Sequence, residues 1–179
     1  MSNDVHRLPL LVMVSAAAGS GKTTLARLIA DELDVPLLSR DPISRGIRRT
    51  EGVMPLPSRS WSIWYGALAY LLGNSVSLVM DQAMYRGIAE PDIKTHLLGL
   101  CRARLIHCFA SNALERFKAR ERARHGESSS EYQRVLGVAL QAEKLTIEPP
   151  ELGVDALKVD TSDGYRPSLQ EVLAFILSS

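Results

Sequence analysis

The stretch SAAAGSGKTTLARLIA, residues 15–30, decides the fold. Residues 16–23 fit the Walker A pattern G-x-x-x-x-G-K-[ST], with Ala16 in place of the first glycine. A short apolar run, residues 8–15, precedes the motif, and an amphipathic helical pattern, residues 22–33, follows it. A strand, a glycine-rich loop and a helix in this order form a phosphate site, because backbone N–H groups and the positive end of the helix surround the anion.

This P-loop predicts ATP and Mg²⁺ as cofactors. Lys22 is expected to reach the β- and γ-phosphates, and Thr23 to offer its hydroxyl to Mg²⁺. The full set of expected nucleotide contacts in the loop is Ala18, Gly19, Ser20, Gly21, Lys22, Thr23 and Thr24. A structural glycine turn followed by a chance lysine is the alternative, and the strand and helix on either side argue against it. The loop alone does not define the reaction, because kinases, GTPases and motor ATPases share it.

Short apolar runs alternate with helical patterns along the rest of the chain. Further strands are expected at residues 35–39, 75–80, 104–109 and 156–160, and helices at 61–72, 90–101, 111–124, 130–145 and 168–177. This alternation predicts right-handed βαβ units, and hence a three-layer α/β/α fold with a five-stranded parallel sheet. Residues 1–179 are interpreted as a single domain with an acceptor-binding insertion at about 41–72 and a helical lid at about 116–134, since ligands bind beyond the strand carboxyl ends.

Composition agrees with a globular protein and excludes several classes. The chain has 179 residues, 46% hydrophobic and 23% charged, with a formal net charge of +1, so bulk charge gives no reason to expect a polyanionic partner. Cys101 and Cys108 have no metal-binding spacing, which suits free thiols in a reducing cytoplasm. Residues 8–18 imitate a signal peptide, but cleavage there would cut into the P-loop. No membrane association is expected, and nothing in the sequence indicates an oligomeric state.

A carboxylate follows the second expected strand. The sequence contains neither the N-K-x-D motif of GTPases nor the L-S-G-G-Q motif of ABC ATPases, and an AAA+ machine is expected to need a far longer chain, which leaves small kinases. Asp41 is expected near the γ-phosphate, where a carboxylate can orient a hydroxyl acceptor and take its proton. Asp41 could instead cap a helix that has Pro42 at its first position, and both roles can hold together.

Five motifs together carry a resemblance over nearly the whole chain: AAAGSGKTTLARLIA (16–30), LLSRDPISRGIRR (37–49), SVSLVMDQAM (75–84), ALERFKARERARH (113–125) and LKVDTSDG (157–164). In this combination the chain resembles the P-loop kinase-like group that includes zeta toxin, chloramphenicol phosphotransferase and polynucleotide 5′-hydroxyl kinase. The resemblance implies an ATP-dependent phosphotransferase of P-loop NTPase fold, and it leaves the acceptor open.

The resemblance also implies roles around the acceptor. Asp41 would be the general base, and Arg40 or Arg45 would contact the acceptor. Asp81, after the third strand, would hold Mg²⁺ through water or contact the acceptor; the alternative is an ordinary strand-end turn residue. Residues 159–164 would lie at the edge of the adenine.

Two lid arginines follow from the same resemblance. Arg116 would stack on adenine, and Arg120 would reach the transferred phosphate, tasks that suit a planar, permanently charged guanidinium. The alternative is a solvated helix with surface ion pairs. The loose polar segment HGESSS, residues 125–130, favours a lid tip. His96, His107 and His125 are interpreted as structural or surface residues.

Three functional hypotheses stay open, and a nucleoside monophosphate kinase, in which the arginines would hold an acceptor phosphate, is a fourth that Asp41 argues against. A small molecule with a hydroxyl group, such as an antibiotic, nucleoside or sugar derivative, suits the compact lid and the near-neutral charge. A polynucleotide 5′-hydroxyl is less favoured and would need a basic channel with stacking aromatics. A nucleotide-dependent binding module would not need Asp41. The residues available to an acceptor are Arg40, Arg45, Arg48, Arg49, Arg59, Trp61, Trp64 and Tyr65, although helical spacing indicates that at least two of these aromatics pack in the core.

Overall fold

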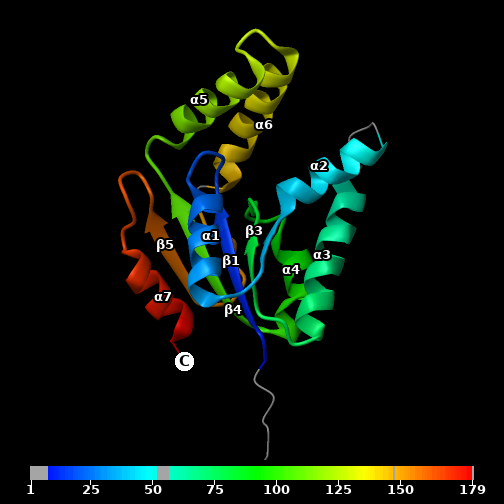
Figure 1. Ribbon diagram of the computed structural model, residues 1–179, viewed down its shortest axis with the longest axis vertical. Helices are drawn as coiled ribbons and strands as arrows, with labels where there is room; N and C mark the ends of the chain where they lie inside the picture. Colours follow the sequence, from blue (N-terminus) through cyan, green and yellow to red (C-terminus); the bar gives the residue numbers. More distant parts are fainter. Residues whose placement is uncertain (1–7, 52–56, 147, 179) are drawn as a thin grey trace, which may run out of the picture.

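A parallel sheet forms the centre of the molecule in the computed structural model, which describes residues 8–51, 57–146 and 148–178 (Figure 1). Its strands are β1 (Leu10–Ala16), β2 (Leu37–Ser39), β3 (Leu78–Asp81), β4 (Arg102–Phe109) and β5 (Ala156–Asp160). The five strands lie in the order β2-β3-β1-β4-β5, and every neighbouring pair is parallel. The predicted five-stranded parallel sheet is therefore confirmed.

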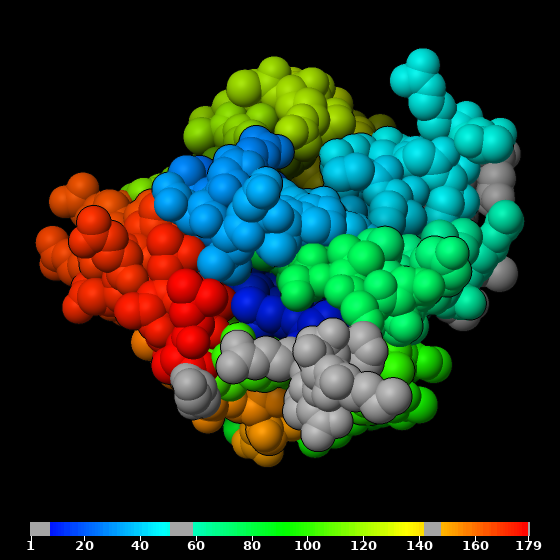
Figure 2. All heavy atoms as spheres, turned by 60° about the horizontal axis from the view of Figure 1, so that its bottom comes forward, coloured from blue at the N-terminus to red at the C-terminus, as the bar shows by residue number. Residues whose placement is uncertain are grey.

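Helices cover both faces of the sheet and extend beyond one of its ends. They are α1 (Lys22–Leu33), α2 (Arg40–Glu51), α3 (Pro57–Gly73), α4 (Glu90–His96), α5 (Ala113–His125), α6 (Ser130–Thr146) and α7 (Leu169–Leu177). Figure 1 shows α1 and α7 on one side of the sheet, α3 and α4 on the other, and the α5–α6 hairpin beyond the strand carboxyl ends. In Figure 2, α7 (red) lies beside α1 (blue), while α2 (light blue to cyan) extends away from them.

Alternation along β1 divides the core into two layers. Leu11 and Met13 pack on one face with Trp64 of α3, while Val12 and Val14 pack on the other face with α1 and α7. All four β1 side chains are fully buried, as expected for a central strand that has helices on both faces. The three-layer α/β/α architecture predicted from the sequence is confirmed.

The aromatic residues of α3 are divided between the core and its margin. Trp64 and Tyr65 are buried together with Leu68, which confirms the prediction that at least two aromatics pack inside. Trp61 is only partly buried, and its ring stacks on Tyr65 at a centroid distance of 5.6 Å.

The helix expected at residues 90–101 is wrong at its C-terminal end. α4 ends at His96, a 3₁₀ turn occupies Leu98–Leu100, and β4 already begins at Arg102. Gly99 lies in this turn, and glycine in a helix interior costs about 1 kcal/mol relative to alanine, which favours an early stop. Leu97 and Cys101 are buried on either side of the turn, so the apolar pattern that indicated a helix reflects core packing instead.

Both cysteines are free and buried. Burial raises the pKa of the Cys101 thiol to about 11 and that of Cys108 to about 12. Within the described ranges, none of the helices has the length and apolar character needed to cross a membrane.

Candidate active site

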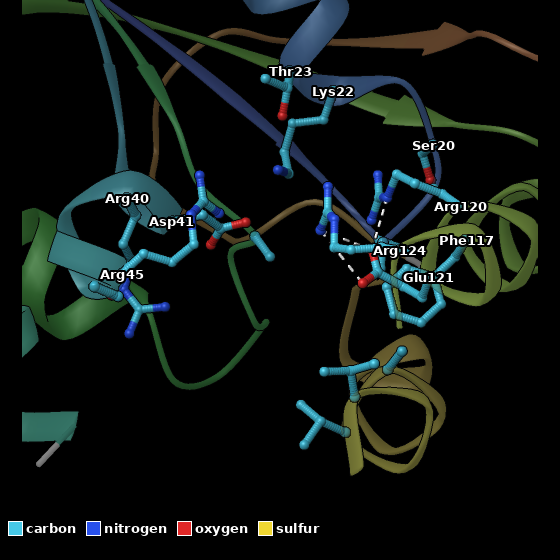
Figure 3. Close-up of a pocket in the computed structure, with 18 of the residues that line it drawn as sticks. Ser20, Lys22, Thr23, Arg40, Asp41, Arg45, Phe117, Arg120, Glu121 and Arg124 are labelled. Carbon is cyan, nitrogen blue, oxygen red and sulfur yellow. Dashed lines mark hydrogen bonds and ion pairs between the residues drawn. The ribbon is translucent and has the colours of Figure 1, made fainter. Parts of the chain in front are cut away.

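An open cleft of about 800 Å³ lies between the P-loop, α2 and the α5–α6 hairpin. Figure 3 shows Lys22 and Thr23 pointing into it, with Asp41 and Arg45 on one side and Arg120 and Arg124 on the other. Of the site residues predicted from the sequence, those that line the cleft are Ala18, Gly19, Ser20, Gly21, Lys22, Thr23, Thr24, Arg40, Asp41, Arg45 and Arg120. Residues far apart in the sequence therefore share one space.

The P-loop shape depends on two glycines. Gly19 and Gly21 have φ angles of +85° and +73°, in the left-handed region that favours glycine. A Cβ on Gly19 would lie 1.9 Å from the carbonyl oxygen of Ala113, the first residue of α5. Gly21 is the N-cap of α1, so the positive end of this helix faces the cleft. This geometry fits a bound phosphate chain. Two amides of the loop already have backbone partners: that of Thr24 donates to the Gly21 carbonyl at 3.0 Å, and that of Ser20 donates to the Ala17 carbonyl at 3.4 Å.

Asp81 lies beneath the P-loop, where three residues converge on its carboxylate. Lys22 Nζ is 2.9 Å from Oδ1, while the Thr23 and Ser39 hydroxyls donate to Oδ2 at 2.8 Å and 3.1 Å. The register explains the position, because Asp81 pairs with Val14 of β1 and Ser39 of β2 at the carboxyl ends of the strands. Only 4% of the Asp81 surface is exposed.

The pair of Thr23 and Asp81 fits Mg²⁺. A hard cation prefers oxygen ligands, and Mg²⁺ at phosphate sites takes only one or two from protein, the rest from water and phosphate. The described residues hold no cluster of three or more His, Cys, Asp or Glu side chains that would bind a metal without such help. A hydroxyl and one carboxylate beside the P-loop are thus oxygen ligands of the kind that Mg²⁺ takes from protein when it also binds phosphate.

α2 supplies the opposite wall. The helix begins at Arg40, so Asp41 lies inside the first turn and not at the N-cap. Asp41 is exposed and lines the cleft, as does Arg45 one turn later. The Arg40 guanidinium lies 3.9 Å from the centre of the Trp61 ring and donates to Ser60 at 3.3 Å. Burial lowers the pKa of Arg40, opposed in part by the nearby Asp41 charge.

The α5–α6 hairpin, which contains the predicted lid, supplies the third wall of the cleft. Arg120 is half exposed; its Nε donates to Glu121 at 2.8 Å, and its guanidinium lies 5.3 Å from the centre of the Phe117 ring. Glu121 is buried and also contacts Arg124 at 3.3 Å and His125 at 3.4 Å. The dashed lines in Figure 3 mark the bonds from Glu121 to the two arginines. One buried carboxylate thus contacts three side chains of the hairpin, Arg120, Arg124 and His125.

Arg116 lies outside this cleft lining. Its guanidinium donates to the carbonyls of Thr161 and Ser162 at 2.9 Å and 2.6 Å, in the loop after β5. The segment expected at the adenine edge is therefore in direct contact with the arginine expected to stack on adenine. The two predicted adenine-site elements come together, and the stacking itself stays a prediction.

No family model matches the chain. Solved structures do. A protein from Chloroflexus aurantiacus, provisionally assigned as a kinase, is 24% identical with a TM-score of 0.72, and the match covers 95% of this chain and 97% of that one. A gluconokinase from Sinorhizobium meliloti is 21% identical (TM-score 0.61; 96% and 93% covered). Kti12 from Chaetomium thermophilum, in complex with ADP-AlF3, is 18% identical (TM-score 0.61; 94% and 97% covered).

The fold is that of the P-loop kinases. The similarity extends over nearly the whole chain. At identities below 25% this likeness defines the fold, while the acceptor has to be argued from the cleft itself.

Several residues of this cleft were not predicted from the sequence. Glu121 and His125 line the cleft, and neither was predicted to be a site residue. Phe117, Glu121, Arg124 and His125 recur at helical spacing, so they share one face of α5. This spacing is the sequence feature that could have predicted that the four residues face the same cleft. Ser44 and Tyr85 also line the cleft, and no sequence motif distinguishes them.

Proposed function

We propose that this protein is an ATP-dependent phosphotransferase that transfers the γ-phosphate of MgATP to a hydroxyl group of a small molecule. One observation carries the proposal: the P-loop, the exposed carboxylate of Asp41 and the basic side chains of the lid all line a single cleft. A binding module would need the first of these elements and not the second.

Asp41 is the proposed general base. As the acceptor oxygen forms its bond to the γ-phosphorus and the bond to the β,γ-bridging oxygen breaks, the hydroxyl proton moves to the Asp41 carboxylate. Asp41 is exposed and lines the cleft, so its carboxylate is accessible to an acceptor. Arg40 and Arg45 would hold the acceptor beside it.

Lys22, Arg120 and the P-loop amides would stabilise the negative charge of the transferred group. Such donors act most strongly when they are fixed before the reaction, because no reorganisation is then needed. Lys22 is held by Asp81 at 2.9 Å, and Arg120 by Glu121 at 2.8 Å. We infer that Lys22 exchanges this carboxylate for the phosphates when nucleotide binds, while closure of the lid excludes water.

Thr23 and Asp81 would hold Mg²⁺, which supplies positive charge beside the β- and γ-phosphates when MgATP is bound. The 2.8 Å hydrogen bond between these two side chains keeps both oxygens together beneath the P-loop. Arg116 and the loop that contains Thr161 would border the adenine.

The test is ADP release from MgATP in the presence of a panel of hydroxyl compounds: aminoglycoside, phenicol and nucleoside antibiotics, sugars, sugar acids, nucleosides and a 5′-hydroxyl oligonucleotide. We expect one class of small molecules to stimulate release, with phosphate recovered on its hydroxyl by mass spectrometry. Stimulation by the oligonucleotide alone would assign the protein to nucleic-acid repair. Slow hydrolysis unaffected by every acceptor would contradict the proposal and favour a nucleotide-dependent binding module.

A further inference from the structure

One face of α2 is directed at the acceptor half of the cleft. Asp41, Ser44, Arg45 and Arg48 follow one another at i, i+3, i+4 and i+7, the spacing of a single helical face, and all four line the cleft. A carboxylate for the hydroxyl proton is thus followed, one and two turns later, by two guanidinium groups. With a rise of 1.5 Å per residue, these lie roughly 6 and 10 Å along the helix from Asp41.

Positive charge exceeds negative charge in the cleft. Its basic lining residues are Lys22, Arg40, Arg45, Arg48, Arg120, Arg124 and Arg134, and its acidic ones are Asp41, Glu121 and Glu131. The phosphates of a bound nucleotide would neutralise the basic side chains at the P-loop and on the α5–α6 hairpin. Arg45 lies at the other end, is exposed, and has no ion-pair or hydrogen-bond partner among the described residues. The acceptor half therefore offers positive charge that a neutral ligand would not match.

A carboxylate of the protein itself already occupies this region. Glu131, in the first turn of α6, accepts from Arg134 Nε at 2.9 Å and Nη2 at 2.8 Å, and lies 3.7 Å from Arg48 of α2. The bond from Arg134 is the main reason that the pKa of Glu131 falls to about 2, so this group is an anion at neutral pH. An anionic oxygen is thus accommodated between α2 and α6.

Ser44 adds an unused hydroxyl to the same wall. Its Oγ is buried, with no hydrogen-bond partner among the described residues. A buried polar atom left without a partner costs free energy, so a ligand oxygen that bonds to it would gain more than it would at an exposed site.

We propose that the acceptor is a small hydroxy compound that also carries a carboxylate or phosphate group, bound by Arg45 and Arg48. In the ligand-free protein, Glu131 stands in for this group beside Arg48. The inference rests on the proposed function, since Asp41 defines where the hydroxyl lies. The Arg48–Glu131 contact joins α2 to α6 across the acceptor end, which favours a small acid over a polymer.

Matched acceptor pairs test the charge requirement. Gluconate and glucose 6-phosphate are compared with glucose, and glycerate with glycerol, by measuring kcat and KM for MgATP-dependent transfer. We expect kcat/KM to be at least about tenfold higher for the anionic member of a used pair, as for other charge-assisted hydrogen bonds. Equal or better transfer to the neutral members would overturn the inference and leave the proposed function intact. Transfer to a 5′-hydroxyl oligonucleotide alone would overturn it as well.

Three variants locate the anion site. Arg45→Gln and Arg48→Gln are expected to raise KM for the anionic acceptor about tenfold with kcat nearly unchanged, because binding in the ground state is lost. Arg49→Gln removes the same charge from the same helix outside the cleft lining, and it should change neither value. An equal effect of all three would overturn the assignment, since it would indicate long-range charge alone.

A binding measurement separates this inference from the proposed function. Gluconate, glucose 6-phosphate and glucose are titrated into the protein by calorimetry in the absence of nucleotide. We expect an anionic probe to bind, Arg45→Gln to weaken it about tenfold, and Glu131→Gln to strengthen it because the internal carboxylate is removed. Absence of anion binding, or weaker binding to Glu131→Gln, would overturn the anion site whether or not the protein transfers phosphate.

Discussion

Thr23 donates its hydroxyl hydrogen to Asp81 across 2.8 Å, joining the first turn of α1 to the carboxyl end of β3. Lys22, the preceding residue, binds the other oxygen of the same carboxylate at 2.9 Å. Two neighbouring residues of the P-loop motif are therefore oriented by one buried anion before nucleotide arrives. The two side chains expected to contact the phosphates and Mg²⁺ are thus already oriented in the nucleotide-free protein.

Replacing Lys22 separates the contribution of the Lys22–Asp81 ion pair to turnover from its contribution to stability. Lys22→Met should lower turnover by about 100-fold or more, as loss of a donor to developing charge does, and lower stability by about 3 kcal/mol because Asp81 is left as a buried uncompensated charge. In Lys22→Met/Asp81→Asn, urea unfolding should show recovered stability while ADP release stays low. Normal turnover in the single variant would contradict the proposed role of the P-loop.

Asp41→Asn tests the proton acceptor. The amide cannot take the hydroxyl proton, so transfer should fall by about 100-fold or more while nucleotide affinity, measured by calorimetry, stays within about twofold. Asp31→Asn makes the same exchange on α1 outside the cleft lining and serves as the control. Unchanged transfer in Asp41→Asn would reduce Asp41 to a residue of the first helical turn.

Glu121→Gln tests how the lid arginines are held. The glutamine has no charge, so Arg120 and Arg124 lose the carboxylate that holds both of them. We expect kcat to fall about tenfold with a smaller change in KM for ATP. Glu115→Gln removes a carboxylate of the same helix that pairs with Lys118 outside the cleft lining, and it should keep full activity. Equal loss in both variants would indicate a general effect on helix α5.

Gly19→Ala tests the approach of the P-loop to the lid. The new Cβ would clash with the Ala113 carbonyl, and the φ angle of +85° disfavours any side chain by roughly 1–2 kcal/mol, so a lower Tm is expected. Gly46→Ala lies in α2 with no atom within 4 Å of the new Cβ and should be neutral or stabilising. A Gly19→Ala protein as stable as the parent would show that the loop can move away from α5.

Thiol labelling measures how tightly the core is closed. Burial raises the pKa of Cys101 to about 11 and of Cys108 to about 12, so both thiols should resist alkylation at pH 8 in the folded protein. Addition of urea should release both at the unfolding midpoint. Rapid labelling of Cys108 without denaturant would indicate local opening of β4.

Local sequence patterns predicted the helices and strands well. They predicted much less well which side chains are buried between those elements. The P-loop and the segments on either side of it were predictable because strand, loop and helix are contiguous, and α1 has the predicted bounds, Lys22–Leu33. The burial of Glu121 was not predictable, because it depends on packing between α5 and other parts of the cleft, which the sequence of α5 alone does not encode. The early end of α4 has the same origin, since Leu97 serves the core outside a helix.

The hydroxyl of Thr161 lies 2.7 Å from the carbonyl of Ser20 and 3.1 Å from that of Phe109. The first of these contacts spans 141 residues of sequence. During synthesis the P-loop emerges before Thr161, so this support for it forms only when β5 and the residue after it have also left the ribosome. Contacts between distant residues slow folding. A nascent chain that lacks β5 and the residue after it also lacks the Thr161–Ser20 contact, so it should bind nucleotide poorly although its whole P-loop motif is present.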